Sequence, residues 1–157
     1  LDNIPFRSQA ARETQYKYLP RRIIVEEYLP MSTMREYHWW TVNGQPVFIC
    51  IRCDQGGQTR GSYFSTAFQE LDIGGAIVEN CKEMPKPKTW DRMLSIVQKM
   101  GENVPGIVCI DLYANDRDVY FSEFTFTRNR CDTLFEPIVA DALLYSMSNG
   151  LIESHLV

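Results

Sequence analysis

Two acidic residues stand in the middle of strand-like runs in which apolar side chains prevail. The stretch VCIDLYANDRDVYFSEFTFT, residues 108–127, carries Asp111 in its first run and Glu123 in its second. A carboxylate in such a place is either a solvated residue on the outer face of a sheet or one of a group that holds a cation. The pairing of the two runs determines whether these carboxylates are close enough to share a cation.

The segment between the two runs predicts a β-hairpin. ANDRD, residues 114–118, is a five-residue loop of a length that hairpins commonly use. It pairs Asp111 with Phe121 and Cys109 with Glu123, so that Asp111 and Glu123 become diagonal neighbours on one face, about 7–8 Å apart at Cα. One or two oxygen-liganded cations could bridge that gap. Alternation also predicts which residues of the second run share the face of Glu123 and which lie on the other: Val119, Phe121, Thr125 and Thr127 on the first, and Tyr120, Phe124 and Phe126 on the second.

The cysteines give a weaker signal. There are five, and only Cys50 and Cys53 are closely spaced, as CIRC. In a strand these two side chains point to opposite faces, and no second Cys/His pair completes a zinc site. Metal or redox use of the pair stays open, but buried thiols in a reducing intracellular compartment, cytoplasm or organelle, are the favoured interpretation.

Composition and charge indicate one globular domain and exclude some functions. The 157 residues are 45% hydrophobic and 12% aromatic, enough for a core. The net charge is -4, and the pair Arg21-Arg22 is too short for a basic stripe, so no nucleic-acid partner is expected. No apolar run approaches the roughly 18 residues of a membrane span.

The order of predicted elements is typical of an α+β fold. Residues 1–20 are expected to be a loosely structured lead-in arm, and 21–157 the folded domain. Asn43-Gly44 predicts a hairpin turn, and Thr89 and Gly101 are the expected ends of a helix. We expect a largely antiparallel sheet with two main helices packed on it, with strands at 21–29, 35–42, 45–52, 59–68, 108–113 and 119–127, a loop at 69–88, and helices at 90–100 and 136–150.

Five short motifs occur in an order and spacing typical of one family: YLPRRIIVEEYL, REYHWWTVNGQPVFI, MPKPKTWDRMLSIVQKM, IDLY and YFSEFTFT. On these motifs, residues 18–152 resemble the C-terminal half of the TupA-like branch of the ATP-grasp fold. The resemblance implies an ATP-dependent carboxylate–amine ligase, in which ATP turns a carboxylate into an acyl phosphate that an amine attacks. It also implies ATP and Mg²⁺ as cofactors.

The resemblance implies roles for particular residues but leaves the catalytic residue unknown. Asp111 and Glu123 match the positions that hold Mg²⁺, and Thr125 stands where many ATP-grasp enzymes have an Asn ligand. The segment VEEYL matches the stretch that lies along adenine, although its acidic pair could equally be an edge-strand surface. The nucleotide-binding candidates are therefore Glu26, Glu27, Tyr28 and Leu29 of that segment, together with His38, at a position that often holds Lys, and Arg60 as a phosphate contact.

The sequence also departs from the family pattern. Cys109 replaces an Arg that would contact the terminal phosphate, Ser122 replaces a Gly, and RNRC at 128–131 replaces a Gly-rich run. The lysine-bearing N-terminal half of an ATP-grasp unit is not matched, which argues against independent activity.

Two hypotheses from different classes follow from these departures. The chain is either the nucleotide- and Mg²⁺-binding half of a ligase, completed by an N-terminal half or a partner subunit, or a catalytically inactive remnant that serves as a structural or interaction subunit. In the second case Tyr37, Trp39 and Trp40 are the candidate exposed aromatics that dock a neighbour. The acid, the amine and the oligomeric state are not indicated.

Overall fold

A hairpin around Asn43 and Gly44 stands at the centre of the computed structural model, which describes residues 20, 22–55, 58–73 and 84–126. Its strands are β1 (Arg35–Val42) and β2 (Gln45–Gln55), paired antiparallel. Asn43 and Gly44 have φ of 49° and 82°, the left-handed conformation that an Asn-Gly hairpin turn requires. The turn predicted from these two residues is therefore confirmed.

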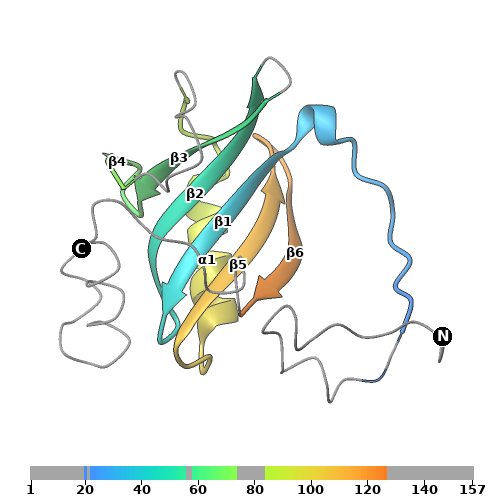
Figure 1. Ribbon diagram of the computed structural model, residues 1–157, viewed down its shortest axis with the longest axis vertical. Helices are drawn as coiled ribbons and strands as arrows, with labels where there is room; N and C mark the ends of the chain where they lie inside the picture. The colour runs from blue at the N-terminus through green and yellow to red at the C-terminus, as the bar shows by residue number, and fades with distance from the viewer. Residues whose placement is uncertain (1–19, 21, 56–57, 74–83, 127–157) are drawn as a thin grey trace.

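The hairpin belongs to one six-stranded sheet in which the strand order is β4-β3-β2-β1-β5-β6 and every pairing is antiparallel (Figure 1). The α+β class and the largely antiparallel sheet are thus confirmed. Because β1 pairs with β5, residues more than sixty positions apart in the sequence become direct neighbours. A 3-10 helix, η2 (Met31–Thr33), precedes β1, and the remaining strands are β3 (Gln58–Ser65), β4 (Glu70–Leu71), β5 (Ile107–Ala114) and β6 (Val119–Thr125).

Helix α1 (Trp90–Gly101) covers one face of this sheet (Figure 1). Its buried Trp90, Met93 and Val97 pack on apolar residues of β1, β2, β3 and β5, and the rings of Trp90 and Trp39 lie 5.0 Å apart. Thr89 precedes the helix as predicted, but its hydroxyl donates to the Asn115 carbonyl at 2.6 Å and caps nothing. The described residues contain one α-helix, and the second predicted helix, 136–150, lies outside them.

Gly101 is the last residue of α1 rather than the first residue after it. This end of the helix lies close to the β1–β2 turn, since a Cβ on Gly101 would lie 2.6 Å from the carbonyl oxygen of Gly44. Only glycine tolerates this contact without a shift of backbone. The end of the helix is therefore fixed against the hairpin.

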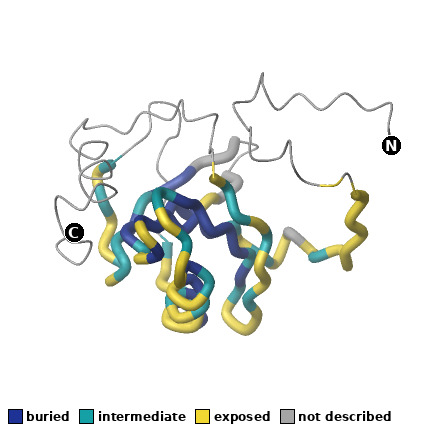
Figure 2. Tube along the Cα trace, turned by 90° about the horizontal axis from the view of Figure 1, so that it is seen from below, coloured by how far each residue is buried: buried dark blue, intermediate teal, exposed yellow. Residues whose placement is uncertain are grey.

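A second apolar cluster lies on the other face of the sheet, and Figure 2 shows buried residues gathered in the middle of the molecule. Trp40 belongs to this cluster, whereas Tyr37 and Trp39 belong to the one beneath α1. These three aromatics are 8%, 2% and 0% exposed, so the prediction that they form an exposed docking surface is wrong. The physical reason is that β1 lies between β2 and β5, and both of its faces are covered.

The predicted strand at 21–29 is also wrong in its described part. Residues 22–30 form no strand, and Figure 1 shows them as a separate stretch of chain beside the β6 edge of the sheet. Ile23, Ile24, Val25 and Tyr28 are between 73% and 90% exposed. A β-branched composition favours a strand only where a neighbouring strand supplies the ladder. Residues 1–19, the predicted arm, lie outside the described ranges.

None of the helices in the described part of the chain is long and apolar enough to cross a membrane.

Candidate functional site

The turn between β5 and β6 sets the position of the two carboxylates. Ala114 pairs with Val119, which leaves a loop of four residues, Asn115–Asp118, rather than the predicted five. The Asn115 side chain accepts hydrogen bonds from the backbone N–H groups of Arg117 and Asp118, both at 2.8 Å. This Asx-type turn tightens the loop, and Val119 packs against the core beneath α1.

A bulge at Ser122 shifts the register of β6 by one residue relative to β5. Leu112 pairs with Phe121 and Asp111 pairs with Glu123, so Ser122 is the extra residue. The predicted pairs Asp111–Phe121 and Cys109–Glu123 are therefore wrong, because a shorter loop and a bulge replace the longer loop. Asp111 and Glu123 still share a face, now as directly opposed residues. Val119 and Phe121, predicted on the face of Glu123, are instead opposite Ala114 and Leu112 of the other face.

Oxygen atoms of three side chains converge where β5 and β6 pair. The Thr125 hydroxyl lies 3.2 Å from Asp111 Oδ2 and 3.4 Å from Glu123 Oε1. Asp111 is buried, Thr125 is half-buried and Glu123 is exposed. The structure thus brings the three predicted metal ligands together, in a donor set of the all-oxygen kind that Mg²⁺ prefers.

His38 joins the same group from β1, where it pairs with Asp111 across the ladder. Its Nδ1 lies 2.8 Å from Asp111 Oδ1, and its Nε2 lies 3.1 Å from Glu36 Oε2. Arg52 approaches the same Glu36 oxygen at 3.4 Å, and the Tyr113 hydroxyl donates to the other oxygen at 3.5 Å. A buried imidazole is thereby fixed between two carboxylates.

The charges around Glu36 determine its ionisation. The hydrogen bond from His38, and the charges of His38 and Arg52, hold the pKa of Glu36 below its usual value, although burial acts in the opposite direction. Burial and the nearby Glu36 carboxylate raise the pKa of Tyr113. Glu36 therefore carries a negative charge beside the ring of His38, with Arg52 as a cationic partner.

Cys109 completes the group from the same face of β5. Its thiol donates to Asp111 Oδ1 at 3.1 Å, and Cys109 and Cys50 are both buried and in no disulfide. An imidazole beside a thiol would activate it as a nucleophile, but here the carboxylate stands between the thiol and His38. We call six of these residues the polar cluster: Glu36, His38, Cys109, Asp111, Glu123 and Thr125.

The remaining predicted site residues are not part of the polar cluster. Glu26, Glu27, Tyr28 and Leu29 lie in the stretch beside the β6 edge, which Figure 1 shows apart from the sheet. Arg60 is opposite Cys53 in the β2–β3 ladder, and the side chains of both positions lie outside the description. Their nucleotide-binding roles stay predictions.

Sequence reasoning missed three participants: Glu36, Arg52 and Tyr113. Glu36 and His38 are two residues apart in a strand, a spacing that puts both side chains on one face. The two polar residues, two positions apart and directly before the apolar pair Trp39-Trp40, formed a pattern from which Glu36 could have been identified. Arg52 and Tyr113 could not be found from spacing, because their roles depend on the order of the strands.

A pocket of about 520 Å³ lies elsewhere, at the end of the sheet near the β5–β6 turn. Arg35, Tyr37, Lys86 and Arg117 are among its lining residues, and none of the polar cluster lines it. Tyr37 faces α1, whereas His38 faces the opposite side. The pocket and the polar cluster are thus separate features of the fold.

Comparison with known proteins gives one match. The sequence profile described as TupA-like ATPgrasp matches residues 7–146, most of the chain. No curated protein and no solved structure matches. At the level of the family, the match indicates an ATP-dependent, ligase-like function.

Proposed function

Because the chain belongs to the TupA-like ATP-grasp family, we propose that its polar cluster binds ATP together with Mg²⁺, as the nucleotide-binding half of a carboxylate–amine ligase. The observation that carries this proposal is the convergence of Asp111, Glu123 and Thr125 at 3.2 and 3.4 Å. Three oxygen donors from two paired strands fit the requirement of a small, hard cation. Mg²⁺ bound there would neutralise the phosphate charges of the nucleotide.

Each of the three residues has a different task. His38 and Cys109 both contact one oxygen of Asp111, Oδ1, and these contacts fix the orientation of its second oxygen, Oδ2. Thr125 lies between the two carboxylates and fixes their spacing. Glu123 is exposed, which gives an entering nucleotide access to the site from solvent.

The cluster is better equipped for binding than for rapid phosphoryl transfer. Transfer to a carboxylate brings two anions together and needs cationic side chains that face the phosphates. His38 and Arg52 both contact Glu36, and Cys109 is a neutral thiol. Basic residues from another surface are therefore required for full ligase activity.

The exposed stretch Ile23–Tyr28 favours a second candidate function, that of an interaction subunit, because a partner could cover its apolar side chains. Four of its apolar side chains are at least 73% exposed, and contiguous exposed apolar residues mark interaction sites. A partner subunit, or another part of a longer polypeptide, that covers this stretch would bring the predicted adenine-binding residues Glu26 and Glu27 against the sheet. Binding of a partner and completion of the nucleotide site are then one event.

Titration calorimetry with Mg²⁺ and a non-hydrolysable ATP analogue tests the proposal. We expect weak binding that requires Mg²⁺, and a loss of at least about tenfold, roughly 1.4 kcal/mol, in Asp111→Asn and in Glu123→Gln. The matched control is Glu70→Gln, which removes an exposed carboxylate from β4 at the far edge of the same sheet. Absence of nucleotide binding, or binding that neither substitution weakens, would count against the proposal.

A further inference from the structure

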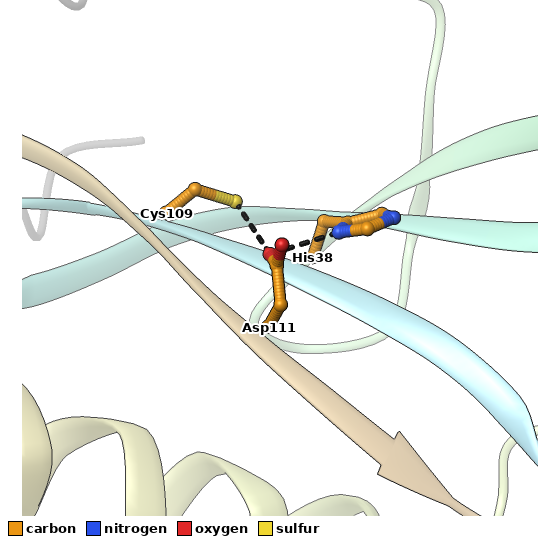
Figure 3. Close-up of side chains that lie close together, drawn as sticks. All are labelled: His38, Cys109 and Asp111. Carbon is orange, nitrogen blue, oxygen red and sulfur yellow. Dashed lines mark hydrogen bonds and ion pairs between the residues drawn. The ribbon is translucent and has the colours of Figure 1, made fainter. Parts of the chain in front are cut away.

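We propose that His38, Cys109 and Asp111 form a second metal site, for a transition metal of the Zn²⁺ type. One nitrogen, one sulfur and one carboxylate oxygen of these residues lie within 4.8 Å of one another. Figure 3 shows the three side chains pointing toward each other, His38 from β1 and the other two from β5. This donor set differs from the all-oxygen set of Asp111, Glu123 and Thr125.

The chemistry of the three ligands selects the metal class. Mg²⁺ takes oxygen ligands and does not favour a thiolate or an imidazole. Zn²⁺ binds both, at about 2.3 Å from sulfur and about 2.0 Å from nitrogen, usually with four ligands. Three protein ligands leave one position for water or another group. Bonding of the metal to sulfur displaces the thiol proton of Cys109 to solvent, and the His38 nitrogen that binds the metal carries no proton, so that the ring N–H is on the other nitrogen, toward Glu36.

Because the site is buried, the charges of the metal and its ligands must compensate each other. His38, Cys109 and Asp111 are 2%, 1% and 3% exposed. A thiolate, a carboxylate and a neutral imidazole around a dication have zero net charge, so such a site does not bury an uncompensated charge. The strands that carry the ligands are paired neighbours within the sheet, which fixes the backbone positions in advance.

An independent observation is that a carboxylate lies beside the second ring nitrogen of His38. The ring nitrogen that faces away from Asp111 lies 3.1 Å from Glu36 Oε2, and Glu36 is held in turn by Arg52. Histidines that bind metal usually donate their other ring N–H to a carboxylate, which fixes the ring orientation and tautomer. The Glu36 carboxylate lies close enough to this nitrogen to take that supporting role, and it is not a member of the ligand group itself.

The two sites share a residue but not an oxygen. Asp111 Oδ1 faces His38 and Cys109, whereas Oδ2 faces Thr125. The transition-metal site therefore does not depend on the proposed nucleotide function. Substitution of Glu123 distinguishes the two, because Glu123 belongs to the all-oxygen set alone.

Cobalt is the probe for the test, because Co²⁺ replaces Zn²⁺ and is coloured. The full chain, reduced and freed of metal by a chelator, is titrated with Co²⁺ without nucleotide. We expect a thiolate-to-cobalt charge-transfer band and the visible bands of four-coordinate cobalt, both removed by Zn²⁺. Cys109→Ser should abolish the charge-transfer band, and His38→Gln should weaken binding at least about tenfold. Circular dichroism verifies that each variant is folded.

Cys50→Ser is the matched control, since Cys50 is a second buried thiol outside any disulfide and is opposite His38 on the neighbouring strand. It should keep the cobalt spectrum, and Glu123→Gln should keep it while losing nucleotide binding. A wild-type chain without the charge-transfer band would overturn the metal site, as would a band that persists in Cys109→Ser. A band lost in Cys50→Ser alone would place the metal at the CIRC pair and equally overturn the proposal.

Discussion

The polar cluster and the stretch Arg22–Leu29 differ in what holds their side chains in place. In the cluster, Asp111 is opposed by His38 on one side and by Glu123 on the other, within ladders that fix the backbone. The stretch carries a β-branched run with no strand in it, and Val25 is 90% exposed. Strand pairing, rather than strand propensity, therefore positions functional side chains in this molecule.

The difference has a consequence for how a nucleotide site can form. The polar cluster lies within paired strands, whereas Glu26 and Glu27 belong to an exposed stretch without a strand, which the proposed partner would have to order. Ordering such a stretch costs conformational entropy, on the order of 1–2 kcal/mol per residue. Nucleotide affinity should therefore depend on the sheet first and on the stretch only after a partner is bound.

The largest expected contrast is in folding stability. Trp39→Ala removes a fully buried ring that lies 5.0 Å from Trp90, and should lower the free energy of unfolding by about 3–5 kcal/mol. Val25→Ser changes an exposed residue and should alter it by less than about 0.5 kcal/mol. Urea unfolding followed by tryptophan fluorescence measures the serine variant, and circular dichroism measures both. A Val25→Ser loss above about 1 kcal/mol would show that the stretch is docked.

A smaller contrast is expected in nucleotide binding by the chain alone. Asp111→Asn should weaken Mg²⁺-nucleotide binding at least about tenfold, because it removes a ligand charge from a fixed position. Glu26→Gln and Glu27→Gln should change it less than about twofold, because neither carboxylate is held against the sheet. The same calorimetric titration compares all three. Equal losses in the three variants would mean that the stretch closes on the sheet without a partner.

Much of the sheet was predictable because its signals are local. Asn43-Gly44 determines its own turn, and the spacing of Trp90, Met93 and Val97 predicts the helix that buries them. The shared face of Asp111 and Glu123 was predictable as well, but their pairing was not. The loop is one residue shorter than expected and the bulge at Ser122 adds one residue, so Asp111 and Glu123 stay on one face although their pairing differs.

The rest of the site depends on strand order, which no local pattern reveals. The resemblance made His38 a nucleotide-binding candidate at a position that often holds Lys, and the structure places it against Asp111 because β1 lies next to β5. Tyr37, Trp39 and Trp40 were candidate exposed aromatics under the interaction-subunit hypothesis, but residues on both faces of β1 are buried in apolar clusters, and the sequence alone does not show this.

The smallest contrast compares two tyrosines at alkaline pH. Tyr37 is 2% exposed, and burial raises its pKa to about 12 from 10.0, whereas Tyr28 is 82% exposed. Above pH 10 the unfolded chain ionises at position 37 before the folded chain does. The stabilising contribution of neutral Tyr37 is therefore complete below pH 10 and is lost as pH rises toward 12. Between pH 9 and about pH 10.5 the loss is on the order of 1 kcal/mol. Tyr37→Phe should remove this part of the alkaline decline in unfolding free energy, and Tyr28→Phe should leave it unchanged. An identical decline in wild type and Tyr37→Phe would mean that the Tyr37 hydroxyl is hydrated in the folded chain, and that β1 is less closely covered than the sheet geometry requires.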